Sequence, residues 1–507
     1  MSFDAIIIGG GHNGLAAAIT LQKRGLKVCV LEARETVGGL CAARQFHAGF
    51  TVPGIFHDTN EVRAGLADAL NLTANGLSFR DAEVPVFAPS KSGKGLLLWE
   101  AADKAAGELG ADADGYQELT GIVERAKGAL SAALNEAPPP LIPSAMGDYL
   151  EMARLGFSLR RLGAKDLYEL IRMLTMCLGD VMRDHFKNDL TMAAVAGGAL
   201  MGEYAGPWSA GTAARWLLMR AVSAREVKGG PAALVAALEK SFTSLGGTIR
   251  TGAKVAQVMV EKNRVKGVKL GSGEEVLAAR VGCAINPRAA LMDLVPPAAL
   301  PLATWESVKN VRCRGTSARV HLALEAPIQP QGRPEVFERL RIAESLDELE
   351  RAFDAVKYGE LSATPALDIR QPTVADASLA PAGKHGASIW VNFAPYDLRA
   401  GWNDGTRAKV LEATLARLEA YDPGIRKKVI ASEVLDPATL EKEFGLSGGN
   451  VHHGEMALDQ LLFMRPTPAL SHYKTPIDGL FLCGSGSHPG GGVTLAPGAL
   501  GAAAAVA

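Results

Sequence analysis

The sequence of 507 residues carries almost no net charge and no closely spaced cysteines. Lys and Arg number 53 against 54 for Asp and Glu, so no long-range field would gather nucleic acid or an anionic bilayer. The six cysteines form no Cys-x-x-Cys, the spacing of a redox dithiol or half a zinc site. We therefore expect no nucleic-acid partner, and we interpret the cysteines as small buried residues of a reducing compartment.

Two further features are missing, namely a basic, apolar leader and any window of 18 apolar residues. On these grounds we expect a soluble, cytoplasmic protein. The high content of Ala and Gly is typical of a bacterial genome rich in G and C. The length and the 48% of hydrophobic residues suffice for more than one buried core, which predicts two to four domains.

Glycines at a fixed spacing follow the first apolar run. Residues 3–8 are apolar and rich in isoleucine, and Gly9, Gly11 and Gly14 then lead into 15–24, which has the composition of a helix. In a dinucleotide-binding fold the first glycine makes a tight turn, the second lets the backbone approach a diphosphate, and the third lets helix and strand pack closely. We predict that this loop binds a dinucleotide at the N-terminus of the helix.

An acidic residue ends the second predicted strand. Residues 27–32 (KVCVLE) form this strand, and Glu32 stands 18 residues after Gly14. A carboxylate at this position accepts a hydrogen bond from an adenosine ribose hydroxyl and repels a 2′-phosphate. This argues against NADP. Because the sequence shows no second dinucleotide site, we also expect no stable use of NAD(P)H.

The segment after Glu32 reads ARETVGGL over residues 33–40. Here the sequence resembles the FAD superfamily that includes phytoene desaturases and amine oxidases, in which an arginine and a glycine pair follow the second strand and line the diphosphate. The resemblance implies that Arg34, Gly38 and Gly39 contact FAD. Without it, Arg34 would be interpreted as a solvated charge.

A helix and several short strands are predicted in the middle of the chain. The helix 231–245 begins with proline in its first turn and ends at a glycine pair. Apolar runs with turn signals between them predict strands at 248–250, 253–260, 264–270 and 281–285. In the FAD superfamily such a unit completes the nucleotide-binding domain and lays a strand backbone against adenine, which implies a contact at Val255.

The C-terminal region carries the most specific signature. Residues 444–466 contain a glycine pair, Asp-Gln and Arg-Pro, and 479–493 read GLFLCGSGSHPGGGV. Both segments resemble most closely the phytoene-desaturase-related branch known as pyridine-nucleotide-disulfide-oxidoreductase-domain proteins. No disulfide motif accompanies that resemblance in this sequence.

The loop after the last predicted strand suits a diphosphate and a flavin. Amides near Gly492 and Val493 are placed to donate to the flavin N1 and C2 carbonyl, where negative charge develops on reduction. Ser485 replaces the aspartate that many FAD relatives have after the glycine at Gly484, and its hydroxyl is a weaker, neutral partner for the ribityl chain. The complete set of predicted cofactor contacts is Gly9, Gly11, Asn13, Gly14, Glu32, Ala33, Arg34, Gly38, Gly39, Leu40, Val255, Gly484, Ser485, Gly492 and Val493.

These elements predict an α/β fold, α+β overall, with a Rossmann-type FAD-binding domain and an interleaved substrate domain of mixed sheet and helices, as in amine oxidases and phytoene desaturases. The FAD domain is expected to comprise 1–80, 225–293 and 437–507. The substrate domain is expected to comprise 81–224 and 294–436.

Apolar and basic residues recur at helical spacing from 146 to 182. Arg154, Arg160, Arg161 and Lys165 lie in this stretch. Beside an apolar face they are typical of a helix at a lipid surface, which predicts peripheral membrane contact. The alternative is a solvated helix face packed on a core.

Flavin oxidation needs a dry pocket for the substrate and a group that takes a second proton. His57, after the first glycine pair, and His488, beside the C-terminal loop, are the catalytic candidates, and His452, His453 and Glu455 form a further polar cluster. Each histidine is equally consistent with a hydrogen-bonded loop residue. The adjacent pair lacks metal-ligand spacing, so we predict no metal.

Three functions remain open. The resemblance implies an FAD-dependent dehydrogenase or desaturase of an apolar, isoprenoid or polyene-like small molecule, with hydride transfer to flavin N5 and electrons passed to oxygen or a quinone. The second is a redox-neutral isomerase, or an oxidase of another small molecule, because a fold does not fix a substrate. The third is a flavin-binding interaction protein without turnover. With 6% aromatic residues, the sequence shows no sign of an aromatic cage for an amine, and it does not predict the oligomeric state.

Overall fold

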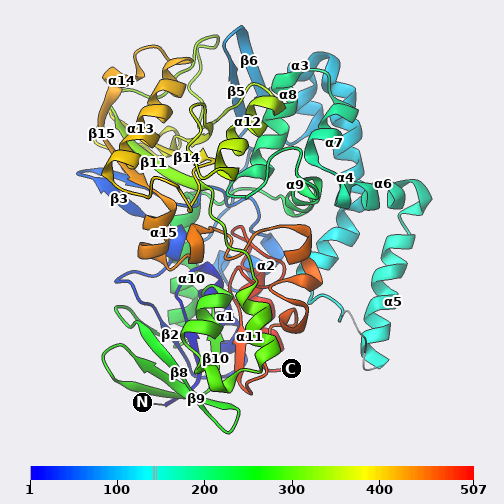
Figure 1. The fold of residues 1–507 in the computed structure, drawn as a ribbon, viewed down its shortest axis with the longest axis vertical. Coiled ribbons are helices and arrows are strands. Elements are labelled where there is room, and N and C mark those ends of the chain that lie inside the picture. The colour runs from blue at the N-terminus through cyan, green and yellow to red at the C-terminus, as the bar shows by residue number, and fades with distance from the viewer. Residues whose placement is uncertain (1, 141–142, 144–145) are drawn as a thin grey trace.

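The computed structural model describes residues 2–140, 143 and 146–507 and builds them around two large sheets (Figure 1). The first sheet has the order β7-β2-β1-β10-β9-β8, with β16 also paired to β10. Its strands are β1 Ser2–Ile8, β2 Val28–Leu31, β7 Thr248–Arg250, β8 Val255–Glu261, β9 Arg264–Leu270, β10 Glu275–Cys283 and β16 Leu480–Leu482. Strands β7, β2, β1, β10 and β16 pair in parallel, whereas β10, β9 and β8 pair antiparallel.

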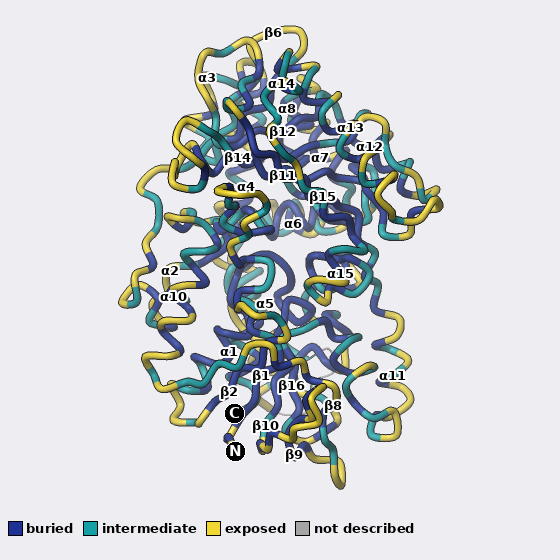
Figure 2. Tube along the Cα trace, turned by 90° about the vertical axis from the view of Figure 1, so that its left-hand side faces the viewer, coloured by how far each residue is buried: buried dark blue, intermediate teal, exposed yellow. Residues whose placement is uncertain are grey.

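The parallel part of this sheet is covered on both faces, which explains its continuous apolar strands. In β1, Ala5 and Ile7 face a cluster with the helices α1 His12–Gln22, α10 Gly230–Ser244 and α16 Ala496–Ala504. Ile6 and Ile8 face the other cluster, which contains side chains of β8, β9 and α11 Leu302–Lys309. Residues 5–8 of β1 are accordingly all buried, the class drawn in dark blue in Figure 2.

The predicted elements are present with shifted ends. The helix expected at 15–24 begins at His12, within the glycine loop. A further helix, α16, follows the C-terminal glycine loop and has Pro497 in its first turn. The strand expected at 281–285 starts at Glu275. Its first half alternates between buried and exposed residues because it pairs with β9 at the solvated side of the sheet.

The second sheet has the order β15-β11-β14-β13-β12-β5-β6. Its strands are β5 Val86–Ser90, β6 Gly93–Leu98, β11 Ser317–Leu324, β12 Arg339–Ile342, β13 Ala366–Arg370, β14 His385–Asn392 and β15 Val429–Leu435. A small hairpin pairs β3 Arg44–His47 with β4 Phe50–Val52. The first sheet and the hairpin use strands from 1–80, 225–293 and 437–507 only, and the second sheet uses strands from 81–224 and 294–436. The exact domain boundaries stay predictions.

Helices complete the upper part of the molecule in Figure 1. Most of them pack together in one apolar cluster, to which Tyr116, Leu170 and Trp216 belong. Helix α13 Asp404–Glu419 packs against the second sheet instead. The remaining helices are α2 Ala64–Ala69, α3 Ala102–Leu109, α4 Ala113–Asn135, α5 Met146–Arg160, α6 Gly163–Thr175, α7 Leu178–His185, α8 Asp189–Gly197, α9 Thr212–Val222, α12 Leu346–Lys357, α14 Ile425–Lys428 and α15 Pro437–Phe444.

Helix α5 stands away from the body of the molecule at the right of Figure 1. It contains no buried residue, and Met146, Leu150 and Phe157 are 76%, 65% and 64% exposed. Leu159, near the end of α5, packs partly buried against the apolar helical cluster, and α6 buries Leu170 and Met173. Contact with a membrane stays a prediction. Within the residues that the structure describes, no helix is long and apolar enough to cross a membrane.

A network of buried ion pairs joins the loop after β4 to the second sheet. Arg370 contacts Asp58 at 2.8 Å, Glu226 at 2.7 Å and Glu338 at 3.1 Å, and Arg339 contacts Asp58 at 3.1 Å. Burial by itself would raise the pKa of Asp58, but Arg339 and Arg370 outweigh it and lower that pKa to about 2. The stabilisation from this carboxylate is thus present above its ordinary pKa of 3.8 and is lost as the pH falls towards 2.

We predict that Arg370→Met lowers the free energy of unfolding at pH 7 by about 3–5 kcal/mol, because it leaves buried carboxylates without their partner. Urea denaturation followed by circular dichroism measures this. Arg399→Met is the matched control, since it removes an exposed pair with Glu360 and should change the free energy by less than about 1 kcal/mol. Equal effects of the two substitutions would contradict the role of the network.

Candidate functional site

The parallel strands of the first sheet end at a common edge. The register aligns Ile8 with Leu31 and with Cys283, and Cys283 with Leu482, so the chain leaves four strands side by side. Ligands of open α/β sheets bind outside such carboxyl ends. A cavity of about 600 Å³ lies there, and we call it the edge cavity.

Most of the predicted cofactor residues line the edge cavity. They are Gly9, Gly11, Asn13, Glu32, Ala33, Arg34, Gly38, Gly39, Leu40, Val255, Ser485 and Gly492. Gly14, Gly484 and Val493 do not line it. A Cβ on Gly14 would lie 1.9 Å from the Gly9 oxygen, one on Gly484 would lie 2.8 Å from the backbone of Ala284, and Val493 is packed in the core. Gly14 and Gly484 therefore permit close packing of the backbone beside the cavity, and the cofactor contacts of all fifteen residues stay predictions.

Glu32 organises the glycine loop as well as facing the cavity. Its carboxylate accepts hydrogen bonds from the backbone N–H of Gly10 at 2.8 Å and of Arg34 at 2.9 Å. The Arg34 guanidinium lies 4.5 Å from the ring centre of Phe444 and donates to the Gly39 oxygen at 3.3 Å. A carboxylate has lone pairs beyond these two hydrogen bonds, so Glu32 is still able to accept from a ribose hydroxyl.

The lining of the edge cavity fits FAD. An added Cβ on Gly11 meets no atom within 4 Å, so the loop backbone is open to an approaching diphosphate. Asn13 Nδ2 donates to Ser485 Oγ at 2.8 Å, which joins the first helix to the C-terminal loop. Among the described residues, Asn13 Oδ1, His12 Nε2 and His453 Nδ1 are buried without a hydrogen-bond partner. A polar cofactor in the cavity would supply such partners.

Several residues that line the edge cavity were not predicted from the sequence. His12, Lys254, Phe444 and Ala284 belong to the edge cavity. The position of His12 inside the glycine loop could have predicted its place in the cavity. The position of Phe444 could not have been predicted, because it depends on where α15 ends in the folded chain. Burial lowers the pKa of His12 to about 4, so its imidazole is neutral near pH 7.

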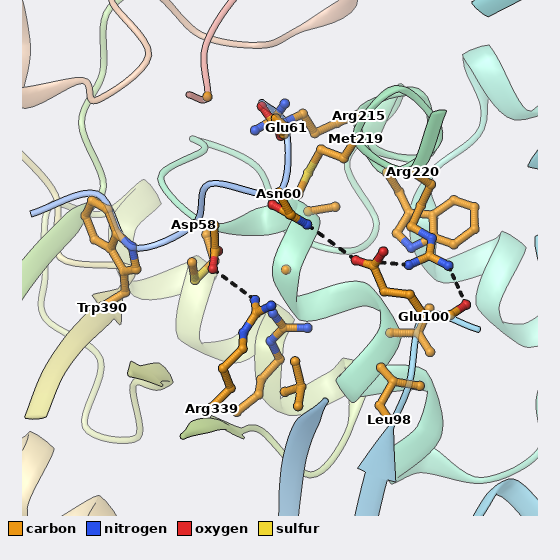
Figure 3. A pocket seen from close by; sticks show the side chains of 18 of the residues that line it. Asp58, Asn60, Glu61, Leu98, Glu100, Arg215, Met219, Arg220, Arg339 and Trp390 are labelled. Carbon is orange, nitrogen blue, oxygen red and sulfur yellow. Dashed lines mark hydrogen bonds and ion pairs between the residues drawn. The ribbon is translucent and has the colours of Figure 1, made fainter. Parts of the chain in front are cut away.

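A second cavity adjoins the edge cavity, and the two share Phe56, Val451 and Gly492. We call it the inner cavity; Figure 3 shows it from close by. Its walls combine apolar and charged residues of the second sheet, of the helical cluster and of loops between them. Among them are Trp99, Val195, Met219 and Trp390 together with Asp58, Glu61, Glu100, Arg215, Arg220, Arg339 and Arg341.

Most charged groups of the inner cavity already have partners. Asp58 pairs with Arg339, and Arg341 pairs with Asp368 at 2.7 Å. Glu100 pairs with Arg220 at 3.3 Å. These carboxylates and guanidinium groups therefore neutralise each other within the protein.

The two candidate catalytic histidines lie outside the inner cavity. His57 lines a third cavity, of about 930 Å³, and its Nε2 lies 2.7 Å from Ser388 Oγ. His488 is fully buried, and its Nε2 lies 3.0 Å from the Ala133 oxygen. Their catalytic roles stay predictions.

The polar cluster 452–455 is divided between the two cavities. His452 lines the inner cavity and His453 the edge cavity. Glu455 instead pairs with Arg312 and Arg314, at 3.1 and 2.6 Å.

The fold and the edge cavity define a class of protein, one that holds a dinucleotide cofactor at the strand ends of a Rossmann-type sheet beside a substrate cavity. The model of the flavin-containing amine oxidoreductase family matches residues 14–507, so the chain belongs to this family. The predicted fold class, the resemblance to phytoene-desaturase-related proteins, the FAD cofactor and the enzyme class are thereby confirmed. The protein is an FAD-dependent oxidoreductase.

Individual relatives span the whole chain. Pyridine nucleotide-disulfide oxidoreductase domain-containing protein 2 of Rattus norvegicus is 31% identical, over 98% of this chain and 92% of its own. A lycopene-forming phytoene desaturase of a Paracoccus species is 24% identical, over 99% and 96%. In structure, a putrescine oxidase bound to putrescine has a TM-score of 0.62 at 17% identity, over 100% and 99% of the two chains.

We predict that Gly11→Val yields a folded protein with at least tenfold weaker FAD binding, because the new side chain fills the space left for the diphosphate. The ratio of flavin to protein absorbance after dialysis measures this. Gly107→Ala is the control, since its added Cβ also meets no atom within 4 Å but lies on the exposed side of α3. Retention of stoichiometric FAD by Gly11→Val would contradict the placement of the diphosphate.

Proposed function

We propose that this FAD-dependent oxidoreductase dehydrogenates a small molecule with an apolar body in the inner cavity, and that the electrons pass on to oxygen or a quinone. The observation that supports this is the contact between the two cavities at Gly492, in the loop predicted to meet the flavin. A substrate in the inner cavity would therefore lie directly against the reactive end of the cofactor.

The size of the inner cavity favours a short substrate. Its volume is about 130 Å³, whereas small-molecule sites usually measure about 300–1,000 Å³. A long polyene would extend beyond it. We infer that the reacting part of the substrate is short and is flanked by apolar walls such as Trp99, Met219 and Trp390.

FAD, when bound, would accept a hydride, that is two electrons and one proton, while the second hydrogen of the substrate leaves as a proton. The protein excludes water from this reaction, since Phe56 and Trp390 meet edge to face at 6.0 Å and the loop at Gly492 is buried. His452, which is 2% exposed and lies against Gly491, closes the cavity on the side of the C-terminal loop. Burial holds the pKa of His452 well below its ordinary value, so this wall is uncharged near neutral pH.

The test is anaerobic addition of short hydrocarbons, alcohols, acids and amines to the purified holoprotein. We expect bleaching of the visible flavin band with a substrate, followed by recovery of the band when oxygen or a quinone is added. Bleaching by amines alone would support amine oxidation, the activity named for the putrescine oxidase neighbour. Product formation without bleaching would instead indicate a redox-neutral isomerase.

We propose in addition that α5 binds the surface of an anionic membrane. Exposed apolar side chains of α5 support this, as does the run 154–165, which holds Arg154, Arg160, Arg161 and Lys165 but no acidic residue. Apolar groups inserted between headgroups and basic groups beside them are the features of a helix that lies in a membrane interface.

We predict that Leu150→Ser combined with Phe157→Ser abolishes flotation with vesicles of phosphatidylcholine and phosphatidylserine. Binding of the unchanged protein should weaken at high salt and with phosphatidylcholine alone, because charge contributes to it. Leu302→Ser removes an equally exposed side chain, on α11, and serves as the control. A change from dimer to monomer in the double variant, with no vesicle binding by the unchanged protein, would assign α5 to a contact between chains.

A further inference from the structure

Two charged side chains of the inner cavity, Glu61 and Arg215, form no hydrogen bond within the described part of the chain, although Arg215 does form an ion pair with Glu203. Among the described residues, Glu61 also forms no ion pair. The nearest carboxylate to Arg215 is Glu203, whose Oε1 lies 3.5 Å from Arg215 Nε without hydrogen-bond geometry. Arg215 is only 8% exposed. A buried guanidinium with unused donors is costly unless a ligand satisfies it.

Both side chains lie at the end of the inner cavity that meets the edge cavity. A Cβ added to Gly492 would lie 1.8 Å from Glu61 Oε2, so the carboxyl group rests on the loop expected at the flavin. Arg215 reaches the same end from α9 and interacts electrostatically with Glu61. Figure 3 shows the two side chains together, apart from the Asp58–Arg339 and Glu100–Arg220 pairs.

The carboxyl groups near Arg215 are poor counter-ions for it. Burial raises the pKa of Glu61, and Arg215 and Arg63 oppose this shift only in part, while Asp58 adds to it. Burial likewise raises the pKa of Glu203. Burial thus weakens both carboxyl groups as counter-ions for Arg215, and the guanidinium keeps N–H groups that form no hydrogen bond within the described residues.

We propose that Arg215 binds a carboxylate group of the substrate, and that protonated Glu61 donates a hydrogen bond to the same carboxylate. This deepens the proposed function and rests on it, since it names the substrate class as organic acids with an apolar body. The apolar walls hold that body, and the carboxylate end lies at Arg215. An arginine offers several N–H groups in a plane, the geometry that suits a carboxylate.

Benzoate, benzylamine and benzyl alcohol are matched probes for this site, because they share a ring and differ in charge. Each is titrated into the oxidised holoprotein, and the change in the visible flavin spectrum gives its Kd without turnover. We expect saturable binding of benzoate that is at least tenfold weaker in Arg215→Met. Arg215→Lys should restore part of the affinity, and Arg264→Met, at an exposed arginine of β9, should bind as the unchanged protein does.

Glu61→Gln tests the second half of the proposal. The amide donates a hydrogen bond at every pH, whereas Glu61 loses its proton as the pH rises through its pKa and then repels benzoate. The Kd for benzoate should therefore increase with pH in the unchanged protein and remain level in Glu61→Gln. A parallel pH dependence in both proteins would overturn the role of Glu61. Thermal melting and FAD content of each variant show that it is folded.

Other outcomes separate the two proposals. Equal benzoate affinity in Arg215→Met and the unchanged protein would overturn the carboxylate site. Tighter binding of benzylamine than of benzoate, lost in Glu61→Gln, would also overturn the carboxylate site. It would show that the site binds a cation through the Glu61 carboxylate. If benzoate binds as expected but no organic acid bleaches the flavin, the carboxylate site is supported and the proposed dehydrogenation fails.

Discussion

The guanidinium of Arg465 is 1% exposed and lies at the centre of the C-terminal loops. Burial lowers its pKa to about 10, so it keeps its charge at neutral pH. A buried charge of this kind is tolerated only when its donors are all used. Its three nitrogens donate to backbone oxygens, which belong to His452, Gly454, Glu455, Gln460 and Ser485. One side chain thus fixes the loop that lines both cavities against the loop that follows the last strand, and the position of His452, His453 and Ser485 depends on it.

Much of the cofactor site was predictable because its determinants are local. The spacing of Gly9, Gly11 and Gly14 is set by a tight turn and a helix start, and Glu32 follows from the end of the next strand. Each of these requirements acts over a few residues and so leaves a readable pattern. The C-terminal glycine loop was recognisable for the same reason. Twelve of the fifteen predicted residues line the edge cavity, and two of the other three are glycines at close backbone contacts beside it.

The inner cavity was not predictable in this way. Glu61 stands in an irregular loop and Arg215 in the middle of a helix, and no spacing relates them. What makes them notable is that neither forms a hydrogen bond within the described residues, and that depends on side chains from distant parts of the chain. His57 illustrates the converse, because its place after the glycine pair suggested catalysis, whereas the fold directs its Nε2 to Ser388 on β14. Charge pairing is decided in three dimensions, so a sequence pattern does not report it.

Asp58 and Glu61 show how one loop separates a structural carboxylate from a functional one. They stand three residues apart and both line the inner cavity, where Asp58 is half-buried and Glu61 is buried. Two guanidinium groups of the second sheet reach Asp58, so its pKa falls and it joins the two sheets. Within the described residues, no guanidinium group forms an ion pair with Glu61. Burial therefore outweighs the attraction of Arg215, and the pKa of Glu61 rises. The network around Arg370 therefore has a second consequence. Its guanidinium groups engage Asp58, Glu226 and Glu338, whereas Arg215 has Glu203 as its one ion-pair partner among the described residues and keeps hydrogen-bond donors for a ligand beside the flavin loop.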